Sequence, residues 1–578
     1  MKRKIRMLLA LLLCAVLLGG CAAPRLDRGF GGLLASLKGE AEIPHFSEMV
    51  YERPQAALDD MDSNLEQLEQ ALENGSSMRA VKRILDRCYE DYYHFDTMYC
   101  LAEIRSCQDM TDEYYAGELS WCLDAYYDMQ EYMDDMYYLC GGSAMAERLE
   151  KEYFWEGFAG EYADASLSDF NEETLSLMHR ESALLSEYRE VSASPSVRLD
   201  NGTEVDLYSY LAEAGEDEYY DALMAYYRQY NGVMSRIYID LVKTRRELAD
   251  KLGFSDYEEM AYDYSFDRDY TPAQAARYLE DIRELIVPLY AELGDGSVEY
   301  PWLSESELVR VLRRGTEAMG GEAAEAFAFM ERYGLYDVSL SQYKAGKSYQ
   351  TYLNDYEAPF VFVNPYGDDS DILSFAHEFG HFVDSYTNYN AAESIDVAEV
   401  FSQAMEYLML DYAAETLPAD RLENLRQIKW RDTRDLYVQQ ASFAAFEQAV
   451  YAADPEELSA EFLNELSLRL AVDYGYYDGS SEEYYALSWI DIVHFFEQPF
   501  YVISYPVSND VALQIWEREQ EEPGAGLEIY RKALPREYDG MIATAEAAGL
   551  ESPFAPGRIA QVAEDLRMNL EQAWAQAA

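Results

Sequence analysis

Apolar residues recur at intervals of three and four over most of the chain, and this spacing predicts a mainly helical protein. The clearest stretches are residues 59–88, 216–252 and 271–293, which contain few prolines and many Glu, Ala, Leu and Arg residues. Helical geometry gathers such apolar positions on one face that must be buried. No internal repeat or long low-complexity segment is present. We therefore expect a mainly α fold without repeat architecture.

Two short stretches depart from the helical pattern and predict β-structure. Residues 197–207 carry Asn201-Gly202 between short alternating segments, which is typical of a hairpin. Residues 358–365, with the sequence APFVFVNP, predict a small β element just before the next helical stretch. We place a soft domain boundary where the hairpin leads into the following helix, near residues 195–250.

The helix predicted after this β element contains the sequence AHEFGHFVDSY, residues 376–386. His377 and His381 are four positions apart, so a helix presents both imidazoles on one face. Glu378 completes the H-E-x-x-H pattern, in which two histidines bind zinc and the glutamate acts on a water molecule. The alternative is a buried structural histidine pair. With six histidines in the chain, a chance match is expected in fewer than ~1% of such sequences, so we favour a metal site.

A catalytic zinc site requires a third protein ligand and an open position. Glu399 lies 18 residues after His381, on a second predicted helix with an apolar face. A carboxylate buried there needs a cation, which a divalent metal supplies; an exposed helix acid is the alternative. Glu406 falls on the same face two turns later, where it could accept a hydrogen bond from a ligand histidine. Nitrogen and oxygen donors of this kind suit one zinc ion, with Glu378 as the general base.

The charge balance of the chain is strongly acidic. It has 109 acidic and 45 basic residues among 578, and its formal net charge is −64. Nucleic acid and anionic lipid surfaces are therefore poor partners on electrostatic grounds. The excess of acid favours a well-solvated surface.

The N-terminus has the pattern of an exported protein. Basic residues precede the apolar run 7–18, which is too short for a membrane span, so residues 1–20 are expected to be a secretory signal peptide. Residues 18–21, Leu-Gly-Gly-Cys, resemble a bacterial lipobox, in which Cys21 becomes the lipidated first residue. Residues 21–45 would then be a tether, and the protein would be anchored on the extracytoplasmic face of a bacterial membrane.

Five further cysteines all lie within one N-terminal region. An exported protein can oxidise some of them, but an odd number leaves at least one without an intramolecular partner. Their spacings match no zinc pattern, so we expect buried thiols or an opportunistic disulfide, and the pairing stays open. These cysteines are Cys88, Cys100, Cys107, Cys122 and Cys140.

The sequence HEFGH followed by EVFSQAME, residues 399–406, resembles the zinc oligopeptidases of the oligoendopeptidase F and thimet oligopeptidase family. Upstream, GKSYQTY and APFVFVNP are similar to the family's glycine-containing loop and edge strand, and FSEMVYERP resembles the start of its folded part. The resemblance is strongest over residues 346–505. It implies Glu399 as third zinc ligand and a nearly all-helical, ellipsoidal body with a deep channel for short peptides. The connection between the two motifs is shorter than usual, and Asp384 replaces a further histidine of many members.

The resemblance implies a zinc endopeptidase that hydrolyses internal bonds of short peptides, and the N-terminal pattern adds a lipid anchor. We expect a monomer. Residues 196–578 would form its catalytic region and residues 46–195 an N-terminal helical region. The strand at 358–364 is expected to be an exposed edge that pairs with the substrate main chain, so we take Ala358, Phe360 and Phe362 as substrate-binding.

Two other functions remain open. A zinc carboxypeptidase or dipeptidyl carboxypeptidase would need a fixed cation for the substrate carboxylate. A non-catalytic peptide-binding lipoprotein would not need Glu378, and this residue counts against it. The cations available for the first alternative are Lys344, Lys347, Arg431 and Arg434.

Residues 494–505, HFFEQPFYVISY, are similar to the His/Tyr segment that faces the substrate in the family. An unbroken helix would align His494, Tyr501 and Tyr505, but Pro499 predicts that the helix is broken there. We expect Tyr505 to donate a hydrogen bond to the oxyanion, while His494 and Tyr501 orient the peptide. The alternative is that the aromatic stripe belongs to the core.

Overall fold

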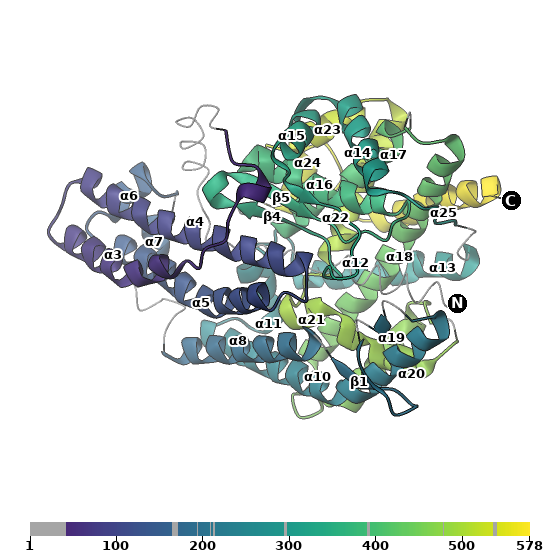
Figure 1. Ribbon diagram of the computed structural model, residues 1–578, viewed down its shortest axis with the longest axis horizontal. Coiled ribbons are helices and arrows are strands. Elements are labelled where there is room, and N and C mark those ends of the chain that lie inside the picture. Colours follow the sequence, from purple (N-terminus) through teal and green to yellow (C-terminus); the bar gives the residue numbers. More distant parts are fainter. Residues whose placement is uncertain are drawn as a thin grey trace.

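The protein is seen in a computed structural model that describes residues 42–155, 157–163, 172–193, 195–207, 210–211, 214–293, 298–389, 394–414, 416–477, 479–535 and 540–577. The predicted signal peptide, Cys21 and most of the predicted tether lie outside these residues. The described chain is mainly helical, with two small sheets (Figure 1). The prediction of a mainly α protein is confirmed.

The first predicted helical stretch, residues 59–88, is interrupted in the structure. Residues 59–88 belong to two helices, α3 (Gln55–Glu73) and α4 (Met78–Gln108), and not to one. The chain turns at Gly75, which has a φ of +60° that suits glycine. After α5 (Glu113–Gly141), three shorter elements complete this part: α6 (Ala146–Glu152), α7 (Phe158–Glu161) and α8 (Glu172–Ala193).

The other two predicted helical stretches are present. Residues 216–252 form α10 (Glu216–Leu252), which ends at Gly253 with a φ of +89°. Residues 271–293 form α12 (Pro272–Leu285) and α13 (Val287–Leu293). Pro288 lacks the N–H that would continue the first helix into the second, which explains the interruption.

Both predicted β elements exist. β1 (Ser196–Arg198) and β2 (Glu204–Asp206) form an antiparallel hairpin whose turn contains Gly202. The second sheet has the order β3-β5-β4. Its central strand β5 (Ala358–Phe362) pairs in parallel with β3 (Tyr336–Asp337) and antiparallel with β4 (Tyr349–Leu353).

The second half of the chain supplies most remaining helices. α16 (Asp371–Asn388), α17 (Ile395–Tyr412) and α22 (Ser504–Glu521) pack together in the upper part of Figure 1. The long α18 (Ala419–Ala452) connects this group to the lower part of the molecule. The other elements are η1 (Phe46–Glu48), α11 (Tyr257–Met260), η3 (Ala261–Ser265), α14 (Glu305–Met319), α15 (Gly321–Tyr333), η4 (Asn354–Tyr356), α19 (Ala460–Asp473), α20 (Glu482–Leu487), η5 (Ser488–Asp491), α21 (Val493–Glu497), α23 (Ala525–Ala533), α24 (Met541–Ala547) and α25 (Arg558–Ala577).

The apolar side chains of the described residues form two cores. The larger core extends from residue 46 to residue 570, and the smaller one lies among α3–α7 on the left of Figure 1. All five cysteines between residues 88 and 140 are buried thiols that form no disulfide among the described residues, as the first of the two expectations had it. No helix in the described part of the chain combines the length and apolar character needed to cross a membrane.

Candidate active site

The start of α16 is fixed by a buried carboxylate. The side chain of Asp371 accepts hydrogen bonds from the backbone N–H groups of Tyr366, Gly367 and Asp368 at 2.8, 2.8 and 3.1 Å. Burial raises the pKa of Asp371 to about 6, and the backbone donors oppose this rise. The carboxylate therefore orders the loop that leads from β5 into the helix of the H-E-x-x-H motif.

Gly380 allows α16 and α17 to approach each other unusually closely. A Cβ at this position would lie 2.4 Å from the carbonyl oxygen of Phe401 and 2.5 Å from the Cα of Ser402. These are backbone atoms of the facing helix and cannot rotate away. Because His381 follows Gly380 and Glu399 precedes Phe401 by two residues, this close crossing brings the two side chains together.

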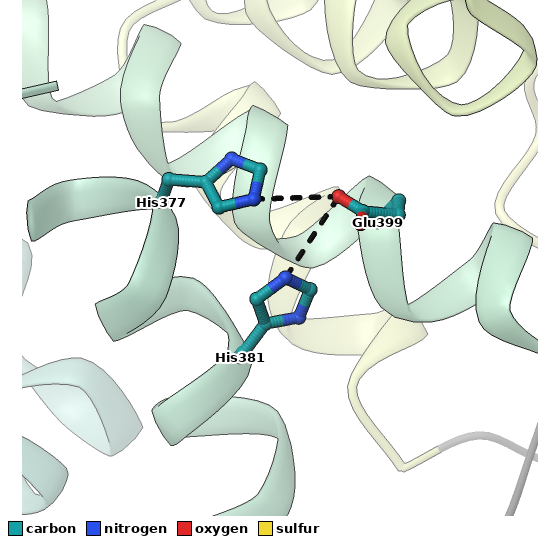
Figure 2. A group of neighbouring side chains, drawn as sticks. All are labelled: His377, His381 and Glu399. Carbon is teal, nitrogen blue, oxygen red and sulfur yellow. Dashed lines mark ion pairs between the residues drawn. The ribbon is translucent and has the colours of Figure 1, made fainter. Parts of the chain in front are cut away.

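The three predicted metal ligands converge on one point (Figure 2). Glu399 Oε2 lies 3.4 Å from His377 Nε2 and 3.8 Å from His381 Nε2. One ligand atom from each residue lies within 4.8 Å of those of the others. The side chains of His381 and Glu399 are 3% and 1% exposed, whereas that of His377 is 21% exposed, so the site is reached from the side of His377.

The donor set fits a zinc ion. Zn–N and Zn–O bonds are about 2.0–2.2 Å long, so two ligands around one tetrahedral ion lie about 3.3 Å apart. The separations of 3.4 and 3.8 Å match this arrangement better than direct hydrogen bonds. The buried carboxylate of Glu399 also requires a positive partner, which an ion between the three side chains would provide.

Two hydroxyl groups hold Glu399 in this orientation. Tyr501 donates a hydrogen bond of 2.8 Å to Oε1, and Ser402 donates one of 2.9 Å to Oε2. Burial raises the pKa of Glu399, while the nearby His377 and these two hydroxyls act in the opposite direction. Tyr501 thus contacts the predicted metal ligand Glu399. The sequence led us to expect that Tyr501 orients the peptide, and this contact was not foreseen.

Glu406 supports the first histidine, as expected. His377 Nδ1 lies 2.8 Å from Glu406 Oε1, and Lys429 Nζ donates to Glu406 Oε2 at 2.8 Å. Burial acts to raise the pKa of Glu406, but Lys429 and His377 outweigh it, so that the pKa is lowered. The carboxylate stays ionised and orients the imidazole so that Nε2 faces the site.

Glu378 has the pKa of a group that can exchange protons near neutral pH. Burial raises its pKa to about 8; the charge on His377 opposes this rise, and the carboxylates of Glu399 and Glu406 add to it. Burial lowers the pKa of His377, but the hydrogen bond to Glu406 and the surrounding carboxylates raise it to about 9. This electrostatic coupling is what one expects where negative groups gather around a place for a cation.

The His/Tyr segment lies beside the ligands and is not one helix. α21 ends at Glu497, Phe500 has a φ of +68°, and α22 begins at Ser504, which confirms the break predicted from Pro499. The rings of His494 and Tyr501 are 5.0 Å apart, and those of Tyr501 and Tyr505 are 5.3 Å apart. The hydroxyl of Tyr505 lies 3.4 Å from His494 Nε2.

His494 is held in its neutral form. Its side chain is buried, and burial lowers its pKa to about 3. A neutral imidazole can share a proton with the Tyr505 hydroxyl without adding positive charge beside the metal ligands. The two side chains therefore form a pair of neutral hydrogen-bonding groups next to Glu399.

Comparisons with known proteins agree with this geometry. The Peptidase M3 N-terminal domain model matches residues 46–166, and the Peptidase family M3 model matches residues 327–536. Together these two models of one family match more than half of the chain. The chain belongs to peptidase family M3. It is therefore an enzyme, a metallopeptidase whose substrates are peptides.

Solved structures share the fold of this M3 peptidase. A candidate oligoendopeptidase F matches with a TM-score of 0.78 and 24% identity, covering 92% of this chain and 99% of its own. PZ peptidase A with an inhibitor matches with a TM-score of 0.77 and 22% identity, covering 91% and 99%. A candidate oligoendopeptidase F from Bacillus anthracis matches with a TM-score of 0.71 and 23% identity, covering 92% and 99%. A search among curated proteins finds no match.

The predicted substrate strand of the M3 peptidase is not an edge. β5 has a neighbour on each side, and the side chains of Ala358, Phe360 and Phe362 are completely buried. β4 pairs with the whole of β5, whereas β3 pairs only with Val361 and Phe362, and Val361 N–H donates to the carbonyl of Leu335. The expectation of an exposed edge strand is wrong, whereas the assignment of Ala358, Phe360 and Phe362 to substrate binding stays a prediction.

Sequence reasoning missed Lys429, which the M3 peptidase uses to support Glu406. Lys429 lies on α18, 23 positions beyond Glu406, and no local motif connects the two residues. It also missed Arg268, which contacts the His/Tyr segment from a turn more than 200 positions earlier. Lys429 stands between Ile428 and Trp430, which is a weak signal of burial, whereas Arg268 stands between Asp267 and Asp269 and has no such signal.

Proposed function

We propose that the protein is a zinc-dependent metalloendopeptidase that cleaves internal bonds of short peptides. The observation that carries the proposal is the convergence of His377, His381 and Glu399 beside the general-base candidate Glu378. The first three would hold one zinc ion. Their donor atoms and spacing suit this metal.

A bound zinc ion would polarise the scissile carbonyl and acidify the attacking water. Glu378 takes the proton of that water and later returns it to the leaving amine. Burial and the neighbouring carboxylates raise the pKa of Glu378 above its ordinary value, whereas a cation held by the three ligands would lower it, so the carboxyl group can serve in both directions. Glu406 and Lys429 keep His377 oriented throughout this proton transfer.

Tyr505 and His494 are assigned to the oxyanion. Both offer hydrogen-bond donors that carry no charge, and they lie next to Glu399 through their packing with Tyr501. Donors of this type stabilise negative charge that develops on the carbonyl oxygen in the transition state. Tyr501 is assigned to the orientation of Glu399, because its hydroxyl donates to that carboxylate.

Internal cleavage is favoured over removal of C-terminal residues. A carboxypeptidase needs a cation for the terminal carboxylate of its substrate, and the four cations considered for this task all have acidic partners within the protein. Neutralised cations of this kind are poor receptors for a further carboxylate. The pairs are Lys344–Asp337 at 2.8 Å, Lys347–Glu103 at 2.9 Å, Arg431–Asp432 at 3.0 Å and Arg434–Asp435 at 2.7 Å.

The test is cleavage of a mixed pool of short peptides followed by mass spectrometry. The pool contains each peptide with a free and with an amidated C-terminus, with and without a chelator. We expect internal cleavage of both forms, its loss with chelator and its return with zinc. Cleavage restricted to free C-termini would instead indicate a carboxypeptidase. Absence of cleavage in zinc-loaded protein would indicate a peptide-binding protein.

We further propose that the enzyme is lipid-anchored through Cys21 outside the cytoplasmic membrane. The support is the basic and apolar N-terminal pattern that ends in Leu-Gly-Gly-Cys. Cys21→Ser should release soluble protein or leave an unprocessed precursor, because stable anchoring needs the lipid chains. Unchanged membrane retention with unchanged processing would contradict this proposal.

A further inference from the structure

The turn between α21 and α22 carries site residues on an unfavourable backbone. Phe500 has a φ of +68°, in the left-handed region that residues with a Cβ seldom adopt. Tyr501 follows it directly, and Tyr505 lies in the first turn of α22. Strain of this kind persists only where surrounding groups enforce it. The groups that hold Phe500 therefore also determine where the two tyrosines lie.

Two buried polar side chains, a glutamate and an arginine, hold the backbone of Phe500 on both sides. Its N–H donates to Glu447 Oε1 at 2.8 Å, and its carbonyl accepts from Arg268 Nη2 at 2.9 Å. Glu447 comes from α18, and Arg268 comes from the segment after η3. Glu447 is completely buried, as is the side chain of Arg268. The bond donated by the Arg268 guanidinium is charge-assisted, and such a bond in a buried environment is stronger than one between neutral groups.

Arg268 also connects the turn to the helix of the third metal ligand. The same Nη2 atom donates to Ser504 Oγ at 2.9 Å, at the start of α22. Its Nε lies 3.3 Å from Asp396 Oδ2, in the first turn of α17 and three positions before Glu399. Arg268 therefore has partners both in the segment that carries the tyrosines and in the helix that carries Glu399.

Aromatic rings limit the movement of this guanidinium. The Cζ atom of Arg268 lies 4.4 Å from the ring centre of Tyr262 and 4.5 Å from that of Phe266. A planar guanidinium stacks well on such rings, and an ammonium group cannot reproduce both the stacking and the forked hydrogen bonds. The site thus requires arginine and not simply a positive charge.

The other end of the segment is held in a similar way. Arg245, on α10, is 1% exposed and donates to the carbonyl of Phe496 at 2.5 Å. This carbonyl belongs to the last turn of α21, the helix that carries His494. Buried arginines therefore fix both α21 and the turn that follows it.

We propose that Arg268 is a positioning residue for peptide hydrolysis, which sets Tyr501 and Tyr505 relative to Glu399 by holding the carbonyl of Phe500 and the hydroxyl of Ser504. This inference rests on the proposed function of the site. A buried arginine that served stability alone would affect unfolding but not the balance of kcat and KM. The distinction can be tested because the oxyanion donors act in the transition state.

The principal variant is Arg268→Lys, which keeps the charge opposite Asp396 but cannot keep all its contacts. We expect kcat on an internally quenched peptide to fall about 10- to 100-fold. KM should change by less than about threefold, and zinc content should equal that of the wild type. Affinity for a phosphinic peptide, which mimics the tetrahedral transition state, should fall by the same factor as kcat/KM in calorimetry.

Arg558→Lys is the matched control. Arg558, at the start of α25, is a buried arginine that pairs with Asp510 at 2.5 Å; Asp510 also lies on α22, but six positions beyond Ser504 and not in the turn at Phe500. It should lower the unfolding temperature while leaving kcat within about twofold of the wild type. An equal loss of kcat in both variants would overturn the proposal, and so would unchanged kcat in folded Arg268→Lys.

Ser504→Ala decides the question if Arg268→Lys does not fold. It removes one partner of Arg268 and should lower kcat about three- to tenfold with wild-type zinc content. Unchanged kcat in this variant would overturn the proposal. The wild-type protein is assayed first. If it cleaves no peptide, the proposed function itself is overturned, and this outcome is distinct from any difference between the variants.

Discussion

Replacement of Gly380 by alanine tests how the metal ligands are brought together. The new Cβ would lie 2.4 and 2.5 Å from backbone atoms of Phe401 and Ser402, whereas ordinary contacts begin near 3.4 Å. α17 must therefore move away from α16 by about 1 Å. Overpacking of this type costs about 1–3 kcal/mol of unfolding free energy.

The displacement acts directly on the ligand separations. His381 follows Gly380 on α16, and Glu399 lies on α17 two residues before Phe401. Metal sites depend on ligand distances within about ±0.2 Å, so a shift of about 1 Å exceeds what the site can accommodate without distortion. We expect zinc affinity to fall about 10- to 100-fold and kcat to fall about 100-fold.

The assay combines competition for zinc with a chromophoric chelator, denaturant unfolding and peptide cleavage at saturating zinc. Gly315→Ala is the control, since its Cβ would meet Met409 Sδ at 2.4 Å, also on α17. A methionine side chain can move aside, so this variant should lose stability but keep its zinc affinity. Wild-type zinc affinity in Gly380→Ala, or an equal loss in Gly315→Ala, would refute the reasoning.

Three further predictions concern single side chains. Glu378→Gln should lower kcat about 10²–10⁴-fold with unchanged zinc content and unfolding temperature, and near-normal turnover would remove this residue from the mechanism. Tyr501→Phe should weaken zinc binding about 10-fold or more. Tyr505→Phe should instead lower kcat about 10²–10³-fold without change in zinc affinity. If Tyr505→Phe weakens zinc binding and Tyr501→Phe lowers only kcat, the two roles are exchanged. His94→Gln should lower the unfolding free energy by about 0.2–1 kcal/mol at pH 6 but not at pH 9. The hydrogen bond with Asp355 raises the pKa of His94, so its contribution is present below the unfolded pKa of about 6.5 and is lost as the pH rises through the folded pKa. An equal effect at both pH values would contradict this assignment.

The metal ligands could be predicted because each has a local signal. His377 and His381 share a helix face by spacing alone. Glu399 stands on an apolar face where an unpaired carboxylate would be costly. Glu406 follows from the same face after two turns. In each case the sequence signal lies within one helix. The structure adds only the close crossing of α16 and α17 that brings the ligands together.

The central position of β5 could not be predicted because the order of strands in a sheet is not a local property of the sequence. APFVFVNP predicts a buried strand equally well in the centre or at the edge of a sheet. Its second neighbour, β3, has only two residues, Tyr336 and Asp337, and lies at the end of a helical stretch. No alternating pattern of that length can be recognised, so the central position of β5 emerges only from the folded chain.

The roles of the tyrosines depend on a turn rather than on their spacing. An unbroken helix would align His494, Tyr501 and Tyr505, but the left-handed Phe500 rotates the second part of the segment. This rotation brings the hydroxyl of Tyr501 onto Glu399. Pro499 predicted that a break exists, whereas its geometry follows from buried groups of α18 and of the segment after η3.

Three neighbouring carboxylates acquire different tasks from their partners. Glu406 has the ammonium of Lys429 and the imidazole of His377, which outweigh its burial and lower its pKa, so it stays ionised and orients a ligand. Glu399 has two hydroxyl donors, which fix its direction but leave most of its charge for a cation between the imidazoles. Glu378 is buried beside both carboxylates, which raises its pKa above its ordinary value and suits a group that takes up and releases a proton. Since the three side chains are chemically identical, the division between support, metal binding and proton transfer comes from the groups placed around each of them.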